Sequence, residues 1–469
     1  TKARQPAASP HTADEFAARL AALAPSKHLA VAFSGGPDSL ALLILAAQWA
    51  KRRKAVSLHA FTVDHGLRAA SAAEAKRAAG MARALGVPHR ILRWTGAKPA
   101  SGIQAAAREA RYRLLLDACR AAGVSDLLVA HHLEDQAETF LLRLARGSGV
   151  DGLSAMAPWR RFDPGFLARP LLDATREQLT AYARARGLEW LEDPSNTDQG
   201  LDRNYLRHAV LPALRARWPQ AARTVSRSAR QCAQADAQLG AWADAEAQAG
   251  MIVDGALMLE PWRLRTAPVR ELLLRHWLKA GGRPLPSARV LATIAEQLAD
   301  AAADRQVVLR YAGVEIRRHR DRAHAMAPLG AVPRSRVPWP DLTRPLLLPA
   351  GLGTLSAEEG SGEIDAARLR GRHLEVGFRQ GGERLQLPGR AHHTALSELC
   401  RAAGMAPWLR DRLPLLWVDG ELAAVADLWV GAPFARAAGT VGTRLRWAGG
   451  AWRDEVFSAA DRTARAPEA

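Results

Sequence analysis

The sequence predicts an α/β protein with a Rossmann-like parallel-sheet domain first, a helical domain next and a small α+β domain last. Up to Gly147, short apolar strands alternate with helices of about ten or more residues. A long Ala/Arg/Leu-rich periodic region follows, and short strand-like runs around one helix end the chain. A chain of 469 residues has room for about two to four domains.

The first domain is predicted from strands and helices that alternate along the chain. The expected strands are 28–33, 56–65, 88–94 and 125–132. The expected helices are 14–25, 38–50, 71–86, one ending at Gly123 and one ending at Gly147. Such alternation is typical of a parallel sheet covered by helices on both faces. Ligands of these sheets bind at the carboxyl ends of the strands, where "SGGPDS", "DHGLR" and "HHLED" fall.

The pattern changes after the sheet domain. Residues 173–207 contain a short amphipathic helix and a polar stretch that either carries function or is an ordinary surface loop. The later segments are expected to be helical at 211–304, strand-like at 305–326, a proline-rich linker at 328–351, and short strands from Leu374 around a helix at 394–403. The predicted domains are therefore 1–212, 213–328 and 340–455.

The composition favours a polyanionic partner. Lys and Arg number 65 against 47 acidic residues, a formal net charge of +18. This excess indicates either a nucleic-acid partner or a basic solubilising surface. No apolar run is long enough to span a bilayer, and the N-terminus lacks the apolar region of a secretory signal, so we expect a cytoplasmic protein without a membrane partner. The three cysteines form no CxxC pair, which disfavours a zinc ribbon or an Fe–S site.

The turn "SGGPDS" (34–39) carries the first chemical signal. Free N–H groups at the start of a helix, together with the helix dipole, favour an anion. Gly35 and Gly36 allow close backbone approach, and Ser34 and Ser39 add hydroxyl donors. An ordinary strand-to-helix turn with a polar cap is the alternative. The turn lacks the lysine of a GxxxxGK[ST] P-loop.

The whole string resembles the SGGxDS signature of the PP-loop ATP pyrophosphatases. That resemblance implies cleavage of ATP between the α- and β-phosphates, with the turn binding pyrophosphate and Asp38 binding Mg²⁺. A bridging Mg²⁺ explains why an acid lies in an anion-binding turn.

Later segments resemble one family of this superfamily, the tRNA(Ile)-lysidine synthetases. They are "HHLEDQAETFLLRLARGSG" (131–149), "REARY" (108–112), "DHGLR" (64–68), "RPLL" (169–172), "EDPSNTDxxxxRNYLRH" (192–208), "GERLQLPG" and the stretch that begins "CRAAGMAPWLRD". The resemblance implies that ATP adenylates C2 of the wobble cytidine of tRNA(Ile) with a CAU anticodon. The ε-amine of free L-lysine then displaces AMP, which changes codon reading from AUG to AUA and charging from Met to Ile. Glu134 departs from the family, which commonly has aspartate there.

The resemblance and the residues together give the candidate site. Asp135 and Glu138 share a helix face and are suited to a lysine ammonium, or to Mg²⁺ with Asp38; a helix-start charge pair is the alternative. Which of His131 and His132 faces the site is open. Candidate catalytic residues are Asp38, Asp135, Glu138, Arg203, His131 and His132, with Asp38 and Asp135 as metal ligands. Candidate ATP-binding residues are Ser34, Gly35, Gly36, Pro37, Asp38, Ser39, Val63, Arg108 and Gly147. Candidate tRNA-binding residues are Arg379, Arg384, Arg401, Arg410 and Arg412.

Three other functions are weighed against this one. A PP-loop tRNA thiolase commonly needs paired cysteines, which the sequence lacks. A non-catalytic RNA-binding module would not need intact "SGGPDS" and "DQAET" motifs. A small-molecule amide ligase does not account for the basic charge. The oligomeric state stays open, with a dimer as one option.

Overall fold

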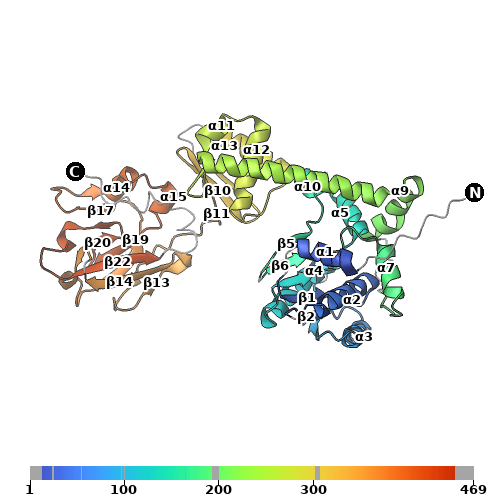
Figure 1. Ribbon diagram of the computed structural model, residues 1–469. Coiled ribbons are helices and arrows are strands. Elements are labelled where there is room, and N and C mark those ends of the chain that lie inside the picture. Colours follow the sequence, from blue (N-terminus) through green and yellow to red (C-terminus); the bar gives the residue numbers. More distant parts are fainter. Residues whose placement is uncertain are drawn as a thin grey trace, which may run out of the picture. The chain divides into compact units, whose positions relative to one another are not determined.

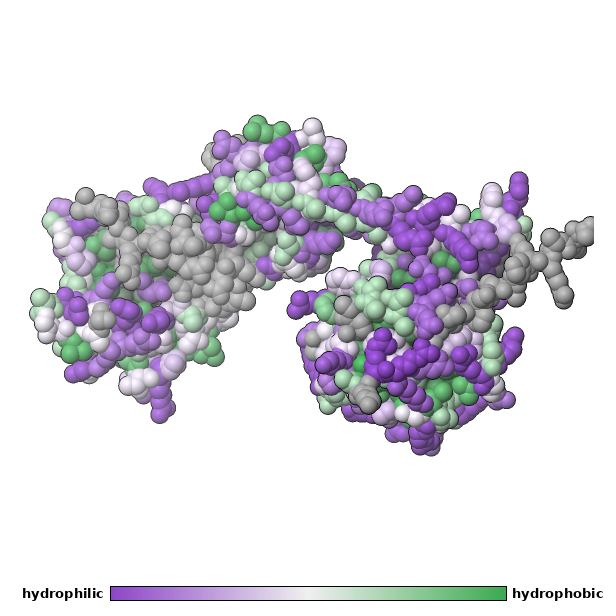
Figure 2. Space-filling view, viewed as in Figure 1, coloured by the Kyte–Doolittle hydropathy of each residue, from purple (hydrophilic) through white to green (hydrophobic). Residues whose placement is uncertain are grey.

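The computed structural model describes residues 13–448 except 24–25, 54, 97, 100, 164, 193–199, 301–306 and 361. The chain forms two compact units that divide between Leu239 and Gly240 (Figure 1). Each unit exposes a mostly hydrophilic surface in the view of Figure 2. No helix among the described residues combines the length and hydrophobicity that a membrane span requires.

The first unit is built on a six-stranded sheet of order β3-β2-β1-β4-β6-β5. Its strands are β1 (His28–Ala32), β2 (Ser57–Asp64), β3 (His89–Arg93), β4 (Asp126–Leu128), β5 (Trp159–Phe162) and β6 (Gly165–Ala168). All neighbours pair in parallel except β5 and β6, which form an antiparallel hairpin at the edge. The predicted Rossmann-like sheet is confirmed, and the hairpin is an addition that the strand pattern did not predict.

Helices pack on this sheet and bury the apolar run of the first helix. They are α1 (Ala13–Ala22), α2 (Pro37–Lys51), α3 (Ser71–Ala84), α4 (Ile103–Ala121), α5 (Leu133–Ala145), α6 (Val150–Leu153) and α7 (Arg176–Arg184). Residues 39–47 of α2 are all buried, because α2 packs against α1, α7 and the sheet. The fourth predicted strand ends early, at Leu128, because His132 caps α5 and the chain turns before it.

The first unit ends in helices that approach α5. These are α8 (Asp202–Tyr205), a π-helical turn (Leu206–Val210), α9 (Leu211–Arg217) and α10 (Ala221–Glu246), whose last residues belong to the second unit. Leu133 and Ala137 of α5 pack with Leu211 and Ala222 in one apolar cluster. π-Helical turns often occur at functional sites, and this one carries Arg207.

The second unit begins with helices around a five-stranded sheet of order β7-β8-β11-β10-β9. The elements are α11 (Leu259–Arg263), α12 (Ala267–Ala280), α13 (Ala288–Asp300), β7 (Ile252–Val253), β8 (Ala256–Met258), β9 (Val308–Tyr311), β10 (Val314–His319) and β11 (Arg322–Met326). Helices and the later strands agree with the prediction. Strands β7 and β8 interrupt the segment expected to be helical, because the Asp254–Gly255 turn folds them into a hairpin with both residues at positive φ.

Two further sheets form the C-terminal part, with orders β12-β16-β19-β20-β21 and β13-β14-β22-β15. The strands are β12 (Val337–Pro338), β13 (Leu346–Leu347), β14 (Thr354–Gly360), β15 (Ile364–Asp365), β16 (Leu374–Phe378), β19 (Pro414–Val418), β20 (Glu421–Val425), β21 (Trp429–Val430) and β22 (Gly442–Ala448). A short hairpin of β17 (Arg384–Leu385) and β18 (Thr394–Ala395) and the helices α14 (Leu396–Ala402) and α15 (Pro407–Arg410) complete it. Trp339 and Trp447 are buried in its core.

Candidate active site

The "SGGPDS" turn joins β1 to α2 at the carboxyl edge of the sheet. Gly36 is the N-cap of α2 and Pro37 occupies its first turn, so the free N–H groups of the helix start lie at this turn. Gly35 adopts a φ of +82°, and a Cβ there would lie 2.6 Å from Cδ1 of Leu191. The Ser39 hydroxyl donates to the Gly36 carbonyl oxygen at 3.0 Å and accepts the Ser34 N–H at 3.2 Å. These bonds hold the turn in the shape of an anion cradle.

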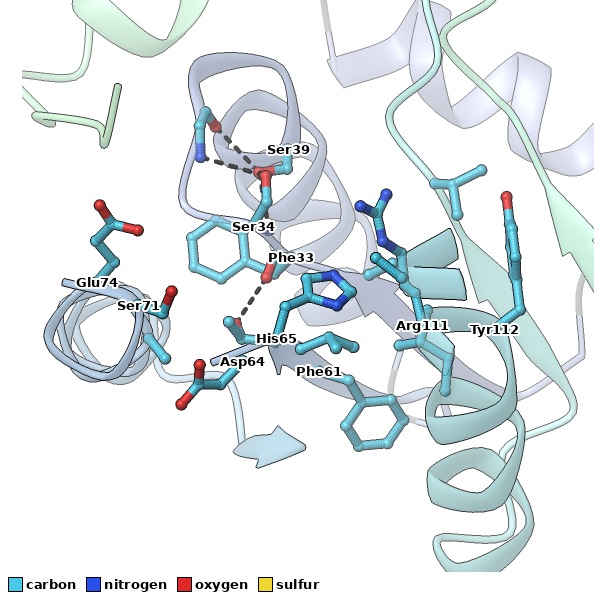
Figure 3. Close-up of a pocket in the computed structure, with 18 of the residues that line it drawn as sticks. Phe33, Ser34, Ser39, Phe61, Asp64, His65, Ser71, Glu74, Arg111 and Tyr112 are labelled. Atoms are coloured by element: carbon cyan, nitrogen blue, oxygen red, sulfur yellow. Dashed lines mark hydrogen bonds between the residues drawn. The ribbon is translucent and has the colours of Figure 1, made fainter. Parts of the chain in front are cut away.

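A cavity of about 690 Å³ opens beside this turn. Of the predicted nucleotide-binding residues, Ser34, Gly36, Asp38, Ser39 and Val63 line it. Figure 3 shows Ser71 and Glu74 of α3 on one side of the cavity and Arg111 and Tyr112 of α4 on the other, with His65 between them. The size suits a nucleotide.

Of the adjacent pair His131 and His132, His131 lines this cavity. Burial lowers its pKa to about 3, so the ring is neutral at physiological pH. Arg169 donates from Nε to Nδ1 of His131 at 3.2 Å, which leaves the proton of the neutral ring on Nε2. His131 therefore offers the cavity an uncharged hydrogen-bond donor.

His132 faces the other way, into a group of buried carboxylates. Its Nδ1 lies 3.0 Å from Oε2 of Glu134, and its Nε2 lies 3.5 Å from Oδ2 of Asp135 and 3.7 Å from Oδ2 of Asp38. Burial opposes protonation, but Asp135, Glu134 and Asp38 outweigh it and raise the pKa of His132. His132 thus links the nucleotide turn to the start of α5.

Behind His132 lies the acidic–arginine cluster, formed by Asp135, Glu138, Arg203 and Arg207. Oδ1 of Asp135 accepts from both guanidinium groups at 3.1 Å each. Glu138 is 0 % exposed and accepts from Arg203 Nε at 2.9 Å, Arg207 Nε at 2.7 Å and Arg207 Nη2 at 3.0 Å. Burial would raise the pKa of Asp135, but His132 and Arg203 outweigh burial and lower it to about 2. The cluster holds two negative and two positive charges.

Glu134, the departure from the family pattern, is buried and fully paired. It accepts the Arg176 backbone N–H at 2.9 Å, at the start of α7, and binds the Arg215 guanidinium at 2.6 Å. Burial would raise its pKa, but His132 and the Arg176 N–H lower it to about 2. These partners tie α5 to α7 and α9, so Glu134 has a structural role here.

Four predicted ATP-binding residues do not line the cavity: Gly35 and Pro37, which belong to the turn beside it, and Arg108 and Gly147, which lie outside the turn. Arg108 lies over the Tyr112 ring at 5.3 Å, and Gly147, with φ of +68°, follows the end of α5. Their assignment to ATP stays a prediction. The segment 193–199 of the predicted "EDPSNTD" motif lies outside the described residues.

The arginines predicted to bind tRNA are mostly engaged within the C-terminal part. Arg379 pairs with Asp411 at 2.9 Å. Three others donate to backbone carbonyl oxygens: Arg384 to that of His393, Arg410 to that of Met405, and Arg412 to that of Trp408. Arg384 and Arg401 are exposed. Burial lowers the pKa of both Arg410 and Arg412.

Two site residues were missed by the sequence reasoning. Arg207 lies four positions after Arg203, the spacing of neighbours on one helix face, and that spacing was the available signal. Arg169 was noted only as the first residue of "RPLL"; its contact with His131 could not be predicted, because only the fold brings the end of β6 next to that histidine.

Two of the three cysteines, Cys119 and Cys400, are buried and do not fit a nucleophile or cluster ligand. Burial raises the pKa of Cys119 to about 12 and that of Cys400 to about 11. Such thiols stay protonated at physiological pH.

Asp38 fits a Mg²⁺ ligand better than Asp135 does. Oδ1 of Asp38 is buried without a hydrogen-bond partner in the described structure, whereas both oxygens of Asp135 are occupied by N–H donors. In the described part of the chain, no three His, Cys, Asp or Glu side chains are arranged so that they could hold a metal ion together. Mg²⁺ commonly takes one or two carboxylates and completes its shell with phosphate oxygens and water, so a single Asp38 oxygen beside a phosphate cradle suffices.

Comparison with known proteins matches three segments of the chain to family domains. Residues 9–214 match a PP-loop domain, 257–324 a TilS substrate binding domain and 374–447 a TilS substrate C-terminal domain. The tRNA(Ile)-lysidine synthase of Methylococcus capsulatus is 39% identical over 91% of this chain and 98% of its own length. That of Alkalilimnicola ehrlichii is 40% identical over 90% and 94%, and that of Escherichia coli O157:H7 is 37% identical over 86% and 93%. The domain limits predicted above stay predictions.

Proposed function

The chain belongs to the tRNA(Ile)-lysidine synthase family, and from that premise we propose how its residues share the work of the reaction. The enzyme is an ATP-dependent ligase that modifies the wobble cytidine of tRNA(Ile) to lysidine. We assign ATP and lysine to separate sites because two compartments lie on either side of His132. One is the nucleotide cavity at Asp38, and the other is the charged cluster at Asp135.

The cavity is proposed to hold ATP. The N–H groups at the start of α2, with the hydroxyls of Ser34 and Ser39, suit the phosphates that leave as pyrophosphate. Apolar side chains of β2, including Phe61 and Val63, line the cavity and suit the adenosine. His131, which lines the cavity, is proposed to donate through its Nε2–H to the phosphate or to the cytidine carbonyl without adding charge.

Asp38 is proposed to hold Mg²⁺ through its unpartnered Oδ1. Burial raises the pKa of Asp38 above that of an ordinary aspartate, and a bound cation would favour its ionised form. Bound there, Mg²⁺ would neutralise charge on the phosphates as the adenylate forms. Asp135 is less suited to this role, because its oxygens already accept from His132, Arg203 and Arg207.

The acidic–arginine cluster is proposed to bind free L-lysine. Lysine carries one carboxylate and two ammonium groups, and the cluster offers carboxylates for an ammonium and guanidinium groups for a carboxylate. Arg203 is 37 % exposed at its side chain and Arg207 is 21 % exposed. Because Arg203 is the more accessible, we propose that it leaves Asp135 and Glu138 when the lysine ammonium arrives.

The test is lysine transfer to tRNA. Enzyme, ATP, Mg²⁺, labelled L-lysine and tRNA(Ile) with a CAU anticodon should give labelled tRNA together with AMP and pyrophosphate. The elongator tRNA(Met), with the same anticodon, is the matched control and should stay unlabelled. Absence of label in tRNA(Ile), with the enzyme folded and ATP bound, would contradict the proposal.

A further inference from the structure

We propose that Trp159 and Phe166 form an aromatic platform on which one unpaired base of the substrate tRNA stacks, beside the catalytic cavity. The inference rests on the proposed function, because it takes the tRNA as the substrate. It adds a binding site on the β5–β6 hairpin, which supplies none of the residues that line the cavity.

The two rings form an exposed, contacting pair. Trp159 is 52 % exposed and Phe166 is 43 % exposed. Their centroids lie 5.2 Å apart with an interplanar angle of 89°. Trp159 lies opposite Ala168 and Arg161 lies opposite Phe166, so the two aromatic residues are diagonal neighbours on one face of the hairpin. About half of the Trp159 surface is thereby left open to solvent.

The platform lies at the edge of the sheet where the cavity opens. Strand β6 runs parallel to β4, so Ala168 lies at its carboxyl end, and Trp159 lies opposite Ala168. The next residue, Arg169, is buried and donates to His131 Nδ1 at 3.2 Å, and His131 lines the cavity. One buried side chain therefore connects the platform's strand pair to the cavity wall.

The segment that leads into Trp159 is held on both sides. Arg169 donates through Nη1 to the Ala157 carbonyl oxygen at 2.7 Å and through its backbone N–H to the Pro158 carbonyl oxygen at 2.7 Å. Gln136 of α5 donates to the Met156 carbonyl oxygen and accepts the Met156 N–H, both at 2.8 Å. A side chain presented by a fixed backbone loses little entropy on binding.

The surroundings favour a nucleic-acid base over an apolar protein surface. Trp159 is followed by Arg160 and Arg161, both exposed, and Arg160 lies over the Tyr112 ring at 5.0 Å. Unpaired RNA bases stack on aromatic rings, and neighbouring guanidinium groups suit the phosphates that flank them. The wobble cytidine lies in an unpaired loop, so a site next to the cavity meets unpaired neighbours of the reacting base.

The experiment compares tRNA affinity in matched variants of the full chain. Trp159→Ala and Phe166→Ala should raise the Kd for tRNA(Ile) about 10- to 100-fold, the range for loss of one stacked base. Trp159→Phe should recover most of the affinity. Trp218→Ala, which removes another exposed tryptophan of the same unit, should leave it within about twofold. ATP binding should be unchanged in all four variants.

A tRNA series identifies the stacked base. A set of tRNAs, each with one abasic position in the anticodon loop, is titrated against the wild type and against Trp159→Ala. At the stacked position the abasic tRNA should bind both proteins equally, because the partner of the indole is already missing.

Two results overturn the inference: unchanged tRNA affinity in Trp159→Ala, or equal losses in Trp218→Ala. If the unchanged affinity comes with an altered sedimentation coefficient, the rings belong to a protein contact instead. Failure of the proposed function is distinguishable, because wild-type enzyme would then bind tRNA without incorporating lysine.

Discussion

Replacing Glu138 by glutamine tests whether the acidic–arginine cluster holds the first unit together. Glu138 is fully buried and accepts three bonds from Arg203 and Arg207. A glutamine keeps the shape but leaves two guanidinium groups with one carboxylate and turns an amide NH₂ toward donors. Removing one partner of a buried ion pair destabilises a protein by about 3–5 kcal/mol. The partial exposure of Arg203 screens its share, so we expect about 3 kcal/mol.

Urea unfolding followed by tryptophan fluorescence provides the measurement. Glu138→Gln, Arg207→Gln and the double variant form a cycle, which should give a coupling of about 2 kcal/mol between the two residues. Arg120→Gln is the control, because Arg120 and Asp163 form an exposed pair at 2.6 Å whose loss should change stability by less than about 0.5 kcal/mol. Additive single effects in the cycle, or a Glu138→Gln loss as small as that of Arg120→Gln, would refute the reasoning.

Three further predictions concern the turn and its surroundings. Asp38→Ala should abolish lysine transfer while the protein stays folded; transfer at more than about a hundredth of the wild-type rate would argue against an essential role. Gly35→Ala places a Cβ 2.6 Å from Leu191 Cδ1 at a positive φ, so the KM for ATP should rise at least about tenfold, and an unchanged KM would show that the turn tolerates the shift. The folded pKa of Glu134 is about 2 against an ordinary 4.5, so its stabilisation is present above pH 4.5 and is lost as the pH falls toward 2. Glu134→Gln should therefore flatten the acid limb of a plot of melting temperature against pH, and an unchanged slope would contradict this.

Local patterns predicted the fold where one residue type dominates an element. The apolar strands and the "SGGPDS" turn fall where alternation and glycine content predicted them. The β5–β6 hairpin was not predicted, because Trp159–Phe162 contains two consecutive arginines and lacks the pattern of an apolar strand. Its pairing is decided by a tertiary contact: a Cβ at Gly165 would lie 1.7 Å from the Ser125 carbonyl oxygen, so only glycine lets the strand approach.

The site was predictable as a set of motifs but not as a set of contacts. Asp135, Glu138 and Arg203 were singled out, and they do meet. Sequence gave no means of knowing that His131 and His132 face opposite compartments, because that depends on where β4 ends and α5 begins. The contacts of Arg207 could not be predicted without the helical register of the turn after α8.

The balanced charges of the acidic–arginine cluster affect which cations can bind there in a cell rich in small cations. Two buried carboxylates without partners would attract small cations such as potassium ions or polyamines. Arg203 and Arg207 occupy that place from within the chain, so a competing cation would have to displace a tethered guanidinium. In the enzyme without lysine, Arg203 and Arg207 therefore compete with simple cations for the two carboxylates. An amino acid that carries both an ammonium and a carboxylate can pair with the carboxylates and with a displaced guanidinium at the same time.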